Sequence, residues 1–326
     1  MKLGTLQAGR GVASVGVVLL HTADYFSQDP RFWMRPVFLN IFYFGKYGVS
    51  FFFILSGIVI LLAHWKDQGT PSAWPSYAWK RVRRVYPIYW IMLIPVLLFP
   101  HSQRFSWAIT RWSVLSSLLL IHIGSPVSIL LVGWSLFCEI LFYILFSLVI
   151  LNRTTGYLGL TAWFSGCLWF TFHPRPGLLF VYFLPVQLLF VFGMIITVIY
   201  KKGWISHEPI LLSIGAGIIA FAIYRAKANQ HSFEDIIAGL GCALIMTALI
   251  GLEVKGRIRV SRAWLLLGDA SYAIYLIHMP LLAIMTPKAH QSHLPVVVLF
   301  CLEAGIAVMV GIALHLTVER KLLRTL

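Results

Sequence analysis

Long apolar runs are the feature of this sequence that most restricts its fold. Runs of about 20 residues, the length that a helix needs to cross a bilayer, recur along the chain of 326 residues. Only 11% of the residues are charged, whereas a soluble domain carries about 25%. Strands of a membrane barrel would be about 10 residues long and would alternate in polarity, which these runs do not. The sequence therefore predicts an all-α polytopic membrane protein with the lipid bilayer as its main solvent.

The positive charge of the chain is divided among short clusters between the apolar runs. The formal net charge is +15. Clusters of this kind indicate membrane topology and not a nucleic-acid-binding face, because Lys and Arg are retained on the cytoplasmic side. The four cysteines are scattered singly, with no CxxC pair and no cluster with histidine. We therefore expect no nucleic acid, no metal and no disulfide framework.

About ten segments are predicted to span the membrane, and the basic clusters orient them. The clusters at 80–84 and 152–153 are both expected in the cytoplasm. Spans 85–99 and 133–151 already return the chain to that side, so the apolar segment 105–123 is predicted to be interfacial or re-entrant on the outer side. Both termini are then cytoplasmic. The predicted spans are 10–26, 45–64, 85–99, 133–151, 157–172, 179–200, 209–225, 233–252, 262–286 and 294–317.

Three titratable side chains are predicted to lie at similar depth in the outer half of the membrane. Arg10 marks the cytoplasmic end of the first helix, and His21 projects from the same face about 16 Å further along the axis. In the fourth span, Ser135 and Glu139 are four residues apart and share a face. His278 falls at a similar depth in the ninth span. Ionisable groups inside a membrane are costly, so their coincidence at one depth indicates a functional site.

Each of these residues also has a structural interpretation. His21, taken alone, fits a packed interior histidine equally well, and the position of Asp24 favours the headgroup region over a role in orienting His21. A helical serine such as Ser135 more often bonds its own backbone than acts as a nucleophile. His278 precedes a proline and could support a kink. Glu139 is flanked by apolar residues and needs a partner or a proton, which favours a functional role.

Three further features stand out among the apolar runs. The pair Ser56–Gly57, in FFFILSGIVI, allows another backbone to approach closely. Glu303 is a carboxylate in mid-span without an evident partner, for which a structural hydrogen bond is the favoured role. The cluster KRVRR, with Arg81 and Arg84, serves either as a topology anchor or as a phosphate site, because arginine binds phosphate through paired hydrogen bonds.

Five motifs follow one another along the chain: LQAGRGVASVGVVLLH, YGVSFFFILSGIVI, RVRRVYPIYW, WSLFCE and LGDASYAIYLIHMP. In this order they resemble the opening, the second-helix signature, the Arg-x-x-Arg loop, the Ser-x-x-x-Glu motif and the late Ser-Tyr…His-Pro helix of the acyltransferase-3 family of membrane O-acyltransferases. The five motifs extend from residue 6 to residue 280, so the resemblance covers nearly the whole chain.

The resemblance implies O-acetylation of carbohydrates at the bacterial cytoplasmic membrane, with acetyl-CoA as donor and ten helices. The chain looks most like members that modify exopolysaccharide, and we expect a single membrane domain, 1–326, without the soluble C-terminal domain of some relatives. By this resemblance the functional positions are Arg10, Arg81 and Arg84 for the cofactor and His21, Ser135 and Glu139 for catalysis, to which we add Asp24, Tyr272 and His278 as substrate-binding or supporting residues.

A mechanism follows as a hypothesis. Acetyl-CoA from the cytosol would bind with its phosphates on Arg81, Arg84 and Arg10. Neutral His21 would take the proton of a sugar hydroxyl, while Glu139 would fix the tautomer of the imidazole. A covalent acyl intermediate is an open alternative.

A transporter or flippase for a lipid-linked glycan is the main alternative function. Intramembrane His and Glu suit a proton relay, and ten helices suit a carrier. A catalytically inactive membrane subunit is a third alternative, against which the intact polar set argues. Within the enzyme interpretation, the sequence does not choose the acceptor, the side from which it enters or the oligomeric state.

Overall fold

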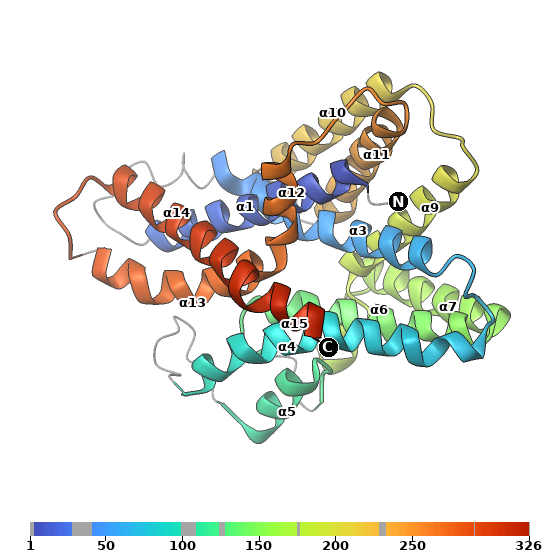
Figure 1. Cartoon of the computed structure of the whole chain (residues 1–326), viewed down its shortest axis with the longest axis horizontal. Helices are drawn as coiled ribbons and strands as arrows, with labels where there is room; N and C mark the ends of the chain where they lie inside the picture. Colours follow the sequence, from blue (N-terminus) through green and yellow to red (C-terminus); the bar gives the residue numbers. More distant parts are fainter. Residues whose placement is uncertain are drawn as a thin grey trace.

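The apolar runs of the sequence form a bundle of helices (Figure 1). In the computed structural model the described residues are 3–27, 41–98, 109–123, 128–174, 177–227, 233–289 and 291–325, and these residues contain no strand. The helical elements are α1 (Gly4–Phe26), η1 (Tyr43–Lys46), α3 (Tyr47–Ala63), η2 (Pro71–Ala73), α4 (Trp74–Leu98), α5 (Arg111–Leu119), α6 (Gly133–Leu151), α7 (Arg153–Phe172), α8 (Leu178–Val181), η4 (Pro185–Leu188), α9 (Leu189–Lys201), α10 (Glu208–Lys227), α11 (Glu234–Val254), α12 (Arg262–Asp269), α13 (Ser271–Ala289), α14 (Val296–Leu314), the π-helical turn η5 (His315–Glu319) and α15 (Arg320–Thr325).

The prediction of an all-α membrane protein is confirmed. Within the described residues, 6 helical segments are long and apolar enough to cross a bilayer, or up to 7 if α12 and α13, which meet at a bend of 59°, count as one span. The helices α1, α4 and α7 pack in the same bundle but carry more polar residues. The number of ten spans stays a prediction.

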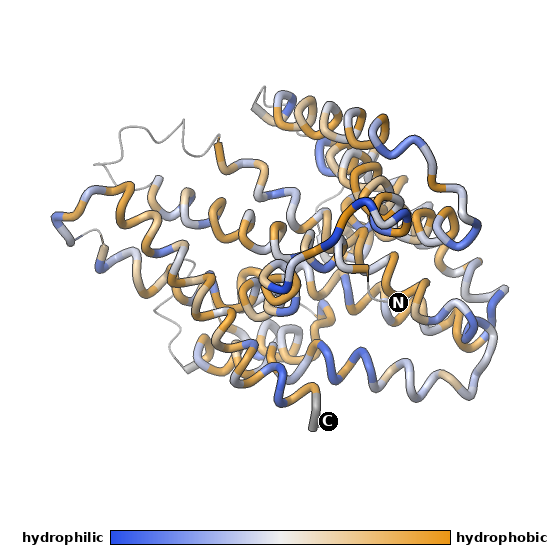
Figure 2. The backbone as a smooth tube through the Cα atoms, turned by 45° about the horizontal axis from the view of Figure 1, so that its top comes forward, coloured by the Kyte–Doolittle hydropathy of each residue, from blue (hydrophilic) through white to orange (hydrophobic). Residues whose placement is uncertain are grey.

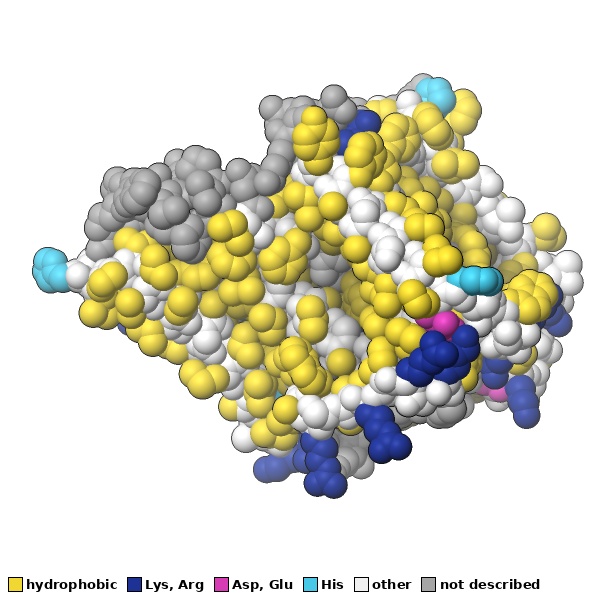
Figure 3. Space-filling view, turned by 90° about the horizontal axis from the view of Figure 1, so that it is seen from above, with side chains coloured by type: hydrophobic (Ala, Val, Ile, Leu, Met, Phe, Trp, Pro, Cys, Tyr) yellow, Lys and Arg dark blue, Asp and Glu magenta, His cyan; other side chains and the backbone are white. Residues whose placement is uncertain are grey.

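The surface of the bundle is apolar over whole helix faces. On α7, Leu158 and Trp169 are 65% and 61% exposed, and on α10 Ile210 and Tyr224 are exposed as well. Hydrophilic residues concentrate at helix ends and connections in Figure 2. Figure 3 shows a face covered mainly by hydrophobic side chains, with most of the visible Lys and Arg at its margins. Contiguous apolar faces of this extent are stable against lipid, so this is a multi-pass membrane protein.

Helix α1 lies in the middle of the bundle and contacts α3, α11, α12, α13 and α14 (Figure 1). Its first turn is capped from another helix. The carboxylate of Glu253, at the end of α11, accepts hydrogen bonds from the backbone N–H groups of Gly4 (2.6 Å) and Thr5 (2.9 Å). These are N–H groups that a helix cannot satisfy within its own first turn. The cap fixes the start of α1 against α11.

The predicted close packing at Ser56–Gly57 is confirmed. A Cβ atom on Gly57 would overlap the carbonyl oxygen of Phe190, and one on Gly193 would overlap that of Ile54. The backbones of α3 and α9 therefore touch at this crossing, as small residues at helix interfaces in membranes permit.

The segment predicted to be interfacial or re-entrant is a short helix that folds back on α4. Residues 105–108 lie outside the described residues. Helix α5 has 9 residues and is about 14 Å long, which is less than half of the thickness of a bilayer core. Three aromatic side chains of α4 donate to the last carbonyls of α5: Tyr86 to Leu119 (2.7 Å), Tyr89 to Ser117 (2.9 Å) and Trp90 to Leu118 (3.0 Å). Its position on the outer side stays a prediction.

Candidate active site

Two cavities follow one another along α1. The large cavity, of about 800 Å³, is lined by the N-terminal half of α1 up to Arg10. The small cavity, of about 140 Å³, is lined by the C-terminal half, including His21. The rise of a helix separates these two residues by about 16 Å. Val49 and Tyr275 line both cavities and so form the wall that the cavities share.

Three arginines line the large cavity. Arg81 and Arg84 do not lie in a loop, as the family motif implies, but three residues apart on α4, where that spacing places them on one face. Arg10 joins them from α1. The Nε atoms of Arg10 and Arg81 are buried without a hydrogen-bond partner. Partly buried guanidinium groups with unused donors favour an anionic ligand, which would supply the missing acceptors.

Arg81 is held in place by aromatic rings. Its guanidinium lies 6.0 Å from the ring centroid of Tyr77 and 5.6 Å from that of Tyr143. Such cation–π contacts stabilise a cation by about 0.5–2 kcal/mol, depending on its exposure. They orient the group but occupy none of its N–H donors, which stay available to a ligand.

Glu139 lines the same cavity as the arginines. One oxygen of its carboxylate accepts hydrogen bonds from Ser56 Oγ (2.7 Å) and from the hydroxyl of Tyr143. Its charge, together with that of Glu319, acts on Arg10. The prediction that Glu139 orients His21 is therefore wrong. The face of α6 that carries Glu139 is turned toward the large cavity, whereas His21 lines the small one.

The partner of His21 is His278 of α13. Nδ1 of His21 lies 2.9 Å from Nε2 of His278, and the two rings are stacked with centroids 5.1 Å apart. The predicted similar depth of these two histidines is confirmed. His278 is completely buried, which a role at a proline kink alone would not require.

The hydrogen-bond chain assigns the tautomers of both rings. Nδ1 of His278 faces the carbonyl oxygen of Ile274 at 3.3 Å and must donate to it. Nε2 of His278 is then the acceptor, so Nδ1 of His21 donates to it. This leaves the lone pair on Nε2 of His21, which is the ring nitrogen that a base needs for a substrate in the small cavity.

Ser135 also lines the large cavity, but its contacts differ from those of a nucleophile. Its hydroxyl lies 3.1 Å from the carbonyl oxygen of Val132 and 2.8 Å from the hydroxyl of Tyr275. Among the described residues it pairs with these two groups and not with a base, whereas nucleophilic serines are activated by a neighbouring base. The ring of Tyr275 in turn lies 5.8 Å from that of His278. Ser135 is therefore connected to the histidine pair through Tyr275, which lies in the wall between the cavities.

The two remaining predicted residues lie at the edges of this arrangement. Tyr272 lines the large cavity and donates its hydroxyl to the carbonyl oxygen of Val85 at 2.9 Å, which ties α13 to α4. Asp24 is exposed one turn beyond His21, close enough for its charge to act on the ring.

Sequence analysis missed two residues of the small cavity, Lys46 and Asp235. Both lie near the ends of predicted spans, where contact with water accounts for a charge. The predicted topology nonetheless indicated that these two residues lie close together. Spans 45–64 and 233–252 both begin on the predicted outer side, so opposite charges at their first residues lie at the same level of the bundle.

A membrane bundle with a cavity lined by three arginines, joined at one wall to a histidine with an available lone pair, defines a group-transferring membrane enzyme. The comparison with protein families identifies which one. The model described as "Acyltransferase domain" matches residues 4–316, so the chain belongs to the acyltransferase-3 family and is an acyl-transferring enzyme.

Two relatives align with this chain over most of their length. The "Exopolysaccharide production protein ExoZ" of Rhizobium meliloti (strain 1021) is 28% identical over 321 residues, which cover 87% of this chain and 91% of ExoZ. The "Acyltransferase MdmB" of Streptomyces mycarofaciens is 25% identical over 320 residues, which cover 85% of this chain and 78% of MdmB. No solved structure matches the chain significantly.

Proposed function

We propose that the protein transfers an acetyl group from acetyl-CoA to a hydroxyl group of an exopolysaccharide sugar. It acts in the bacterial cytoplasmic membrane, with ten spans and both termini in the cytoplasm. One observation carries the proposal: a cavity with three arginines and a cavity with His21 share a wall at Tyr275. A donor with phosphates at one end and a reactive group at the other fits this division.

The large cavity is the proposed donor site. Its volume of about 800 Å³ falls within the range of roughly 300–1,000 Å³ typical of sites for cofactors and small ligands. Arg10, Arg81 and Arg84 would bind the phosphates of the donor, and the apolar walls of α3 and α6 would take its pantetheine arm. The distance of about 16 Å along α1 from Arg10 to His21 suits a ligand of that length.

His21 is the proposed general base. Its Nε2 would accept the proton of the sugar hydroxyl while the hydroxyl oxygen forms a bond to the carbonyl carbon of the thioester. The bond between that carbon and sulfur then breaks, and the departing thiolate takes the proton from His21. The products are the sugar ester and the free thiol of coenzyme A. His278 holds the acting tautomer of His21, which is the role that a carboxylate has in a Ser–His–Asp triad.

Glu139 acts on the donor side. Its carboxylate is fixed by Ser56 and Tyr143 and offsets part of the positive charge of Arg10. The three arginines are half-buried, and carboxylates that line the same cavity offset their charge: Glu139, Glu253 and Asp269. Glu139 therefore helps to stabilise the arginines of the proposed donor site.

The acceptor class follows from similarity in sequence. ExoZ is named for exopolysaccharide production and aligns with this chain over nearly its whole length. The name of MdmB specifies acyl transfer without an acceptor. The first relative is the more similar of the two, which favours a polysaccharide.

The test uses the full chain, purified in lipid nanodiscs, with radiolabelled acetyl-CoA as the donor. The acceptor is exopolysaccharide of the bacterium that encodes the protein, deacetylated with base beforehand. Label is expected in the polysaccharide with the wild-type protein and not with His21→Ala at equal protein concentration. Full transfer by His21→Ala would overturn the assignment of the base. No transfer to polysaccharide by wild-type protein that binds acetyl-CoA would overturn the choice of acceptor.

A further inference from the structure

The small cavity has a charged rim that the mechanism above does not use. Lys46 of η1 and Asp235 of α11 line it with His21, together with Trp134 at the start of α6. The side chains of Lys46 and Asp235 are 35% and 39% exposed. A half-exposed ion pair beside a cavity marks the mouth of that cavity, so the small cavity opens at Lys46 and Asp235.

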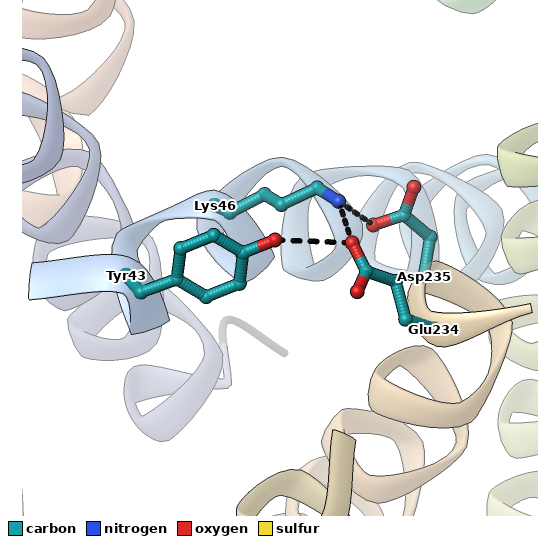
Figure 4. A network of polar contacts seen from close by, with 4 residues as sticks. All are labelled: Tyr43, Lys46, Glu234 and Asp235. Carbon is teal, nitrogen blue, oxygen red and sulfur yellow. Dashed lines mark hydrogen bonds and ion pairs between the residues drawn. The ribbon is translucent and has the colours of Figure 1, made fainter. Parts of the chain in front are cut away.

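A four-residue network fixes this rim (Figure 4). The ammonium group of Lys46 lies between the carboxylates of Glu234 and Asp235, at 3.2 Å from Oδ1 of the latter. The hydroxyl of Tyr43 donates to Glu234 at 3.1 Å. Glu234 is buried and acts as the anchor, whereas Asp235 keeps one side toward the cavity and solvent.

The rim is held close to the histidine pair by a backbone contact. A Cβ atom on Gly45 would overlap the carbonyl oxygen of Gly16, so η1 lies directly against α1. Lys46 follows Gly45, and His21 lies just over one turn beyond Gly16. Both side chains consequently reach the same cavity from adjoining elements.

The lining of the small cavity matches the chemistry of a sugar. A carboxylate accepts hydrogen bonds from sugar hydroxyls, and an ammonium group donates to their oxygens. The indole of Trp134 offers an apolar wall against which the C–H face of a sugar ring can pack. The cavity, of about 140 Å³, is smaller than the roughly 300–1,000 Å³ of a complete ligand pocket, so it suits one sugar unit at a time.

We infer that the small cavity is the acceptor subsite, an inference that rests on the proposed function. Lys46, Asp235 and Trp134 bind the sugar unit whose hydroxyl reacts at His21. The sugar enters past Lys46 and Asp235, from the end of α1 opposite to the donor cavity.

The experiment measures both Michaelis constants with the nanodisc assay, using radiolabelled acetyl-CoA and base-deacetylated exopolysaccharide from the producing strain. Asp235→Asn and Trp134→Leu are each expected to raise the KM for the polysaccharide about tenfold or more, because each removes one contact to the sugar. The KM for acetyl-CoA is expected to stay unchanged.

A control variant separates recognition from folding. Lys255→Met breaks an ion pair at the end of α11, with Glu208 at 2.6 Å, and neither residue lines either cavity. This variant is expected to keep the wild-type KM for the polysaccharide.

The outcomes distinguish this inference from the proposed function. If the wild-type protein transfers acetyl groups and Asp235→Asn and Trp134→Leu keep its KM for polysaccharide, the subsite is refuted while the function stands. A similar rise in both KM values, or an equal rise in Lys255→Met, would assign the effect to folding and also refute the subsite. No transfer to the polysaccharide by wild-type protein refutes the proposed acceptor and, with it, the proposed function.

Discussion

The hydroxyl of Tyr275 lies 2.8 Å from Ser135 Oγ, and Tyr275 is one of the two residues that line both cavities. Its ring lies 5.8 Å from that of His278. Tyr275 is thus the structural link between the arginine cavity and the histidine pair. In the proposed mechanism, the reacting carbonyl group of the donor must pass this side chain to reach His21.

We predict that Ser135→Ala retains activity within about tenfold of wild type, because one neutral hydrogen bond contributes only about 1 kcal/mol. A serine nucleophile would instead be indispensable. The measurement is kcat for acetyl transfer, combined with mass spectrometry of the intact protein after incubation with acetyl-CoA alone. An acetylated Ser135, or complete loss of transfer in Ser135→Ala, would contradict the structural role.

For His278 we predict a split between two substitutions. His278→Leu removes the acceptor for Nδ1 of His21 and is expected to lower kcat about 100-fold or more, within the range of general base catalysis. His278→Gln supplies an amide oxygen at a similar distance and is expected to recover part of that loss. KM for acetyl-CoA should stay constant in both, because His278 does not line the donor cavity.

Glu139→Gln is the contrasting variant. Because Glu139 bonds to Ser56 and Tyr143 and not to His21, its neutralisation is expected to leave the pH dependence of kcat/KM unchanged. His278→Gln is expected to alter that dependence, since it changes the direct partner of the base. A shifted pH profile in Glu139→Gln alone would restore the carboxylate to the role that sequence analysis assigned to it.

The arginine cavity yields a prediction about donor binding. Arg84→Ala is expected to weaken acetyl-CoA binding by about 1.5–3 kcal/mol, which is roughly 10- to 100-fold in Kd. Arg81→Lys keeps the charge but loses the planar group that stacks on Tyr77 and Tyr143, so it is expected to weaken binding as well. Binding is measured by titration calorimetry in nanodiscs, with Lys201→Met as a control on a basic residue outside the cavity. If these variants bound acetyl-CoA as tightly as the wild-type protein, the arginines would serve only to orient the chain in the membrane.

Sequence patterns predicted the elements more accurately than their contacts. The predicted span 133–151 coincides with α6, and the pairing of Ser56–Gly57 with another backbone is present at α9. Both depend on local rules, namely the length of an apolar run and the absence of a side chain on glycine. The first predicted segment, 10–26, likewise falls within α1, and the tenth, 294–317, contains the whole of α14.

The contacts of Glu139 and His21 show what sequence patterns could not predict. Depth along a span follows from residue number, and for His21 and His278 it was correct. The rotation of a helix about its axis does not follow from residue number, because in a bundle nearly every face is apolar. The bend of 59° between α12 and α13 further changes which residues face α1. The hydrogen-bond partners of Glu139 could therefore be identified only from the structure.

The crossing of α3 and α9 connects fold and donor site in a last prediction. A Cβ atom on Gly193 would overlap the carbonyl oxygen of Ile54, so Gly193→Ala must push α3 away from α9. Overpacking of this kind costs about 1–3 kcal/mol. The displacement also moves Ser56, two residues beyond Ile54, whose hydroxyl holds Glu139. We expect a lower thermal unfolding temperature and a weaker affinity for acetyl-CoA in the same variant.

The matched control is Gly217→Ala on α10. A Cβ atom there meets nothing within 4 Å, so the substitution adds no contact and raises helix propensity by about 1 kcal/mol. Its unfolding temperature should equal or exceed that of wild type, with unchanged donor affinity. If Gly193→Ala matched this control in both measurements, α3 and α9 would not be in backbone contact at this crossing. If it lost stability but kept its donor affinity, the position of Glu139 would not depend on that contact.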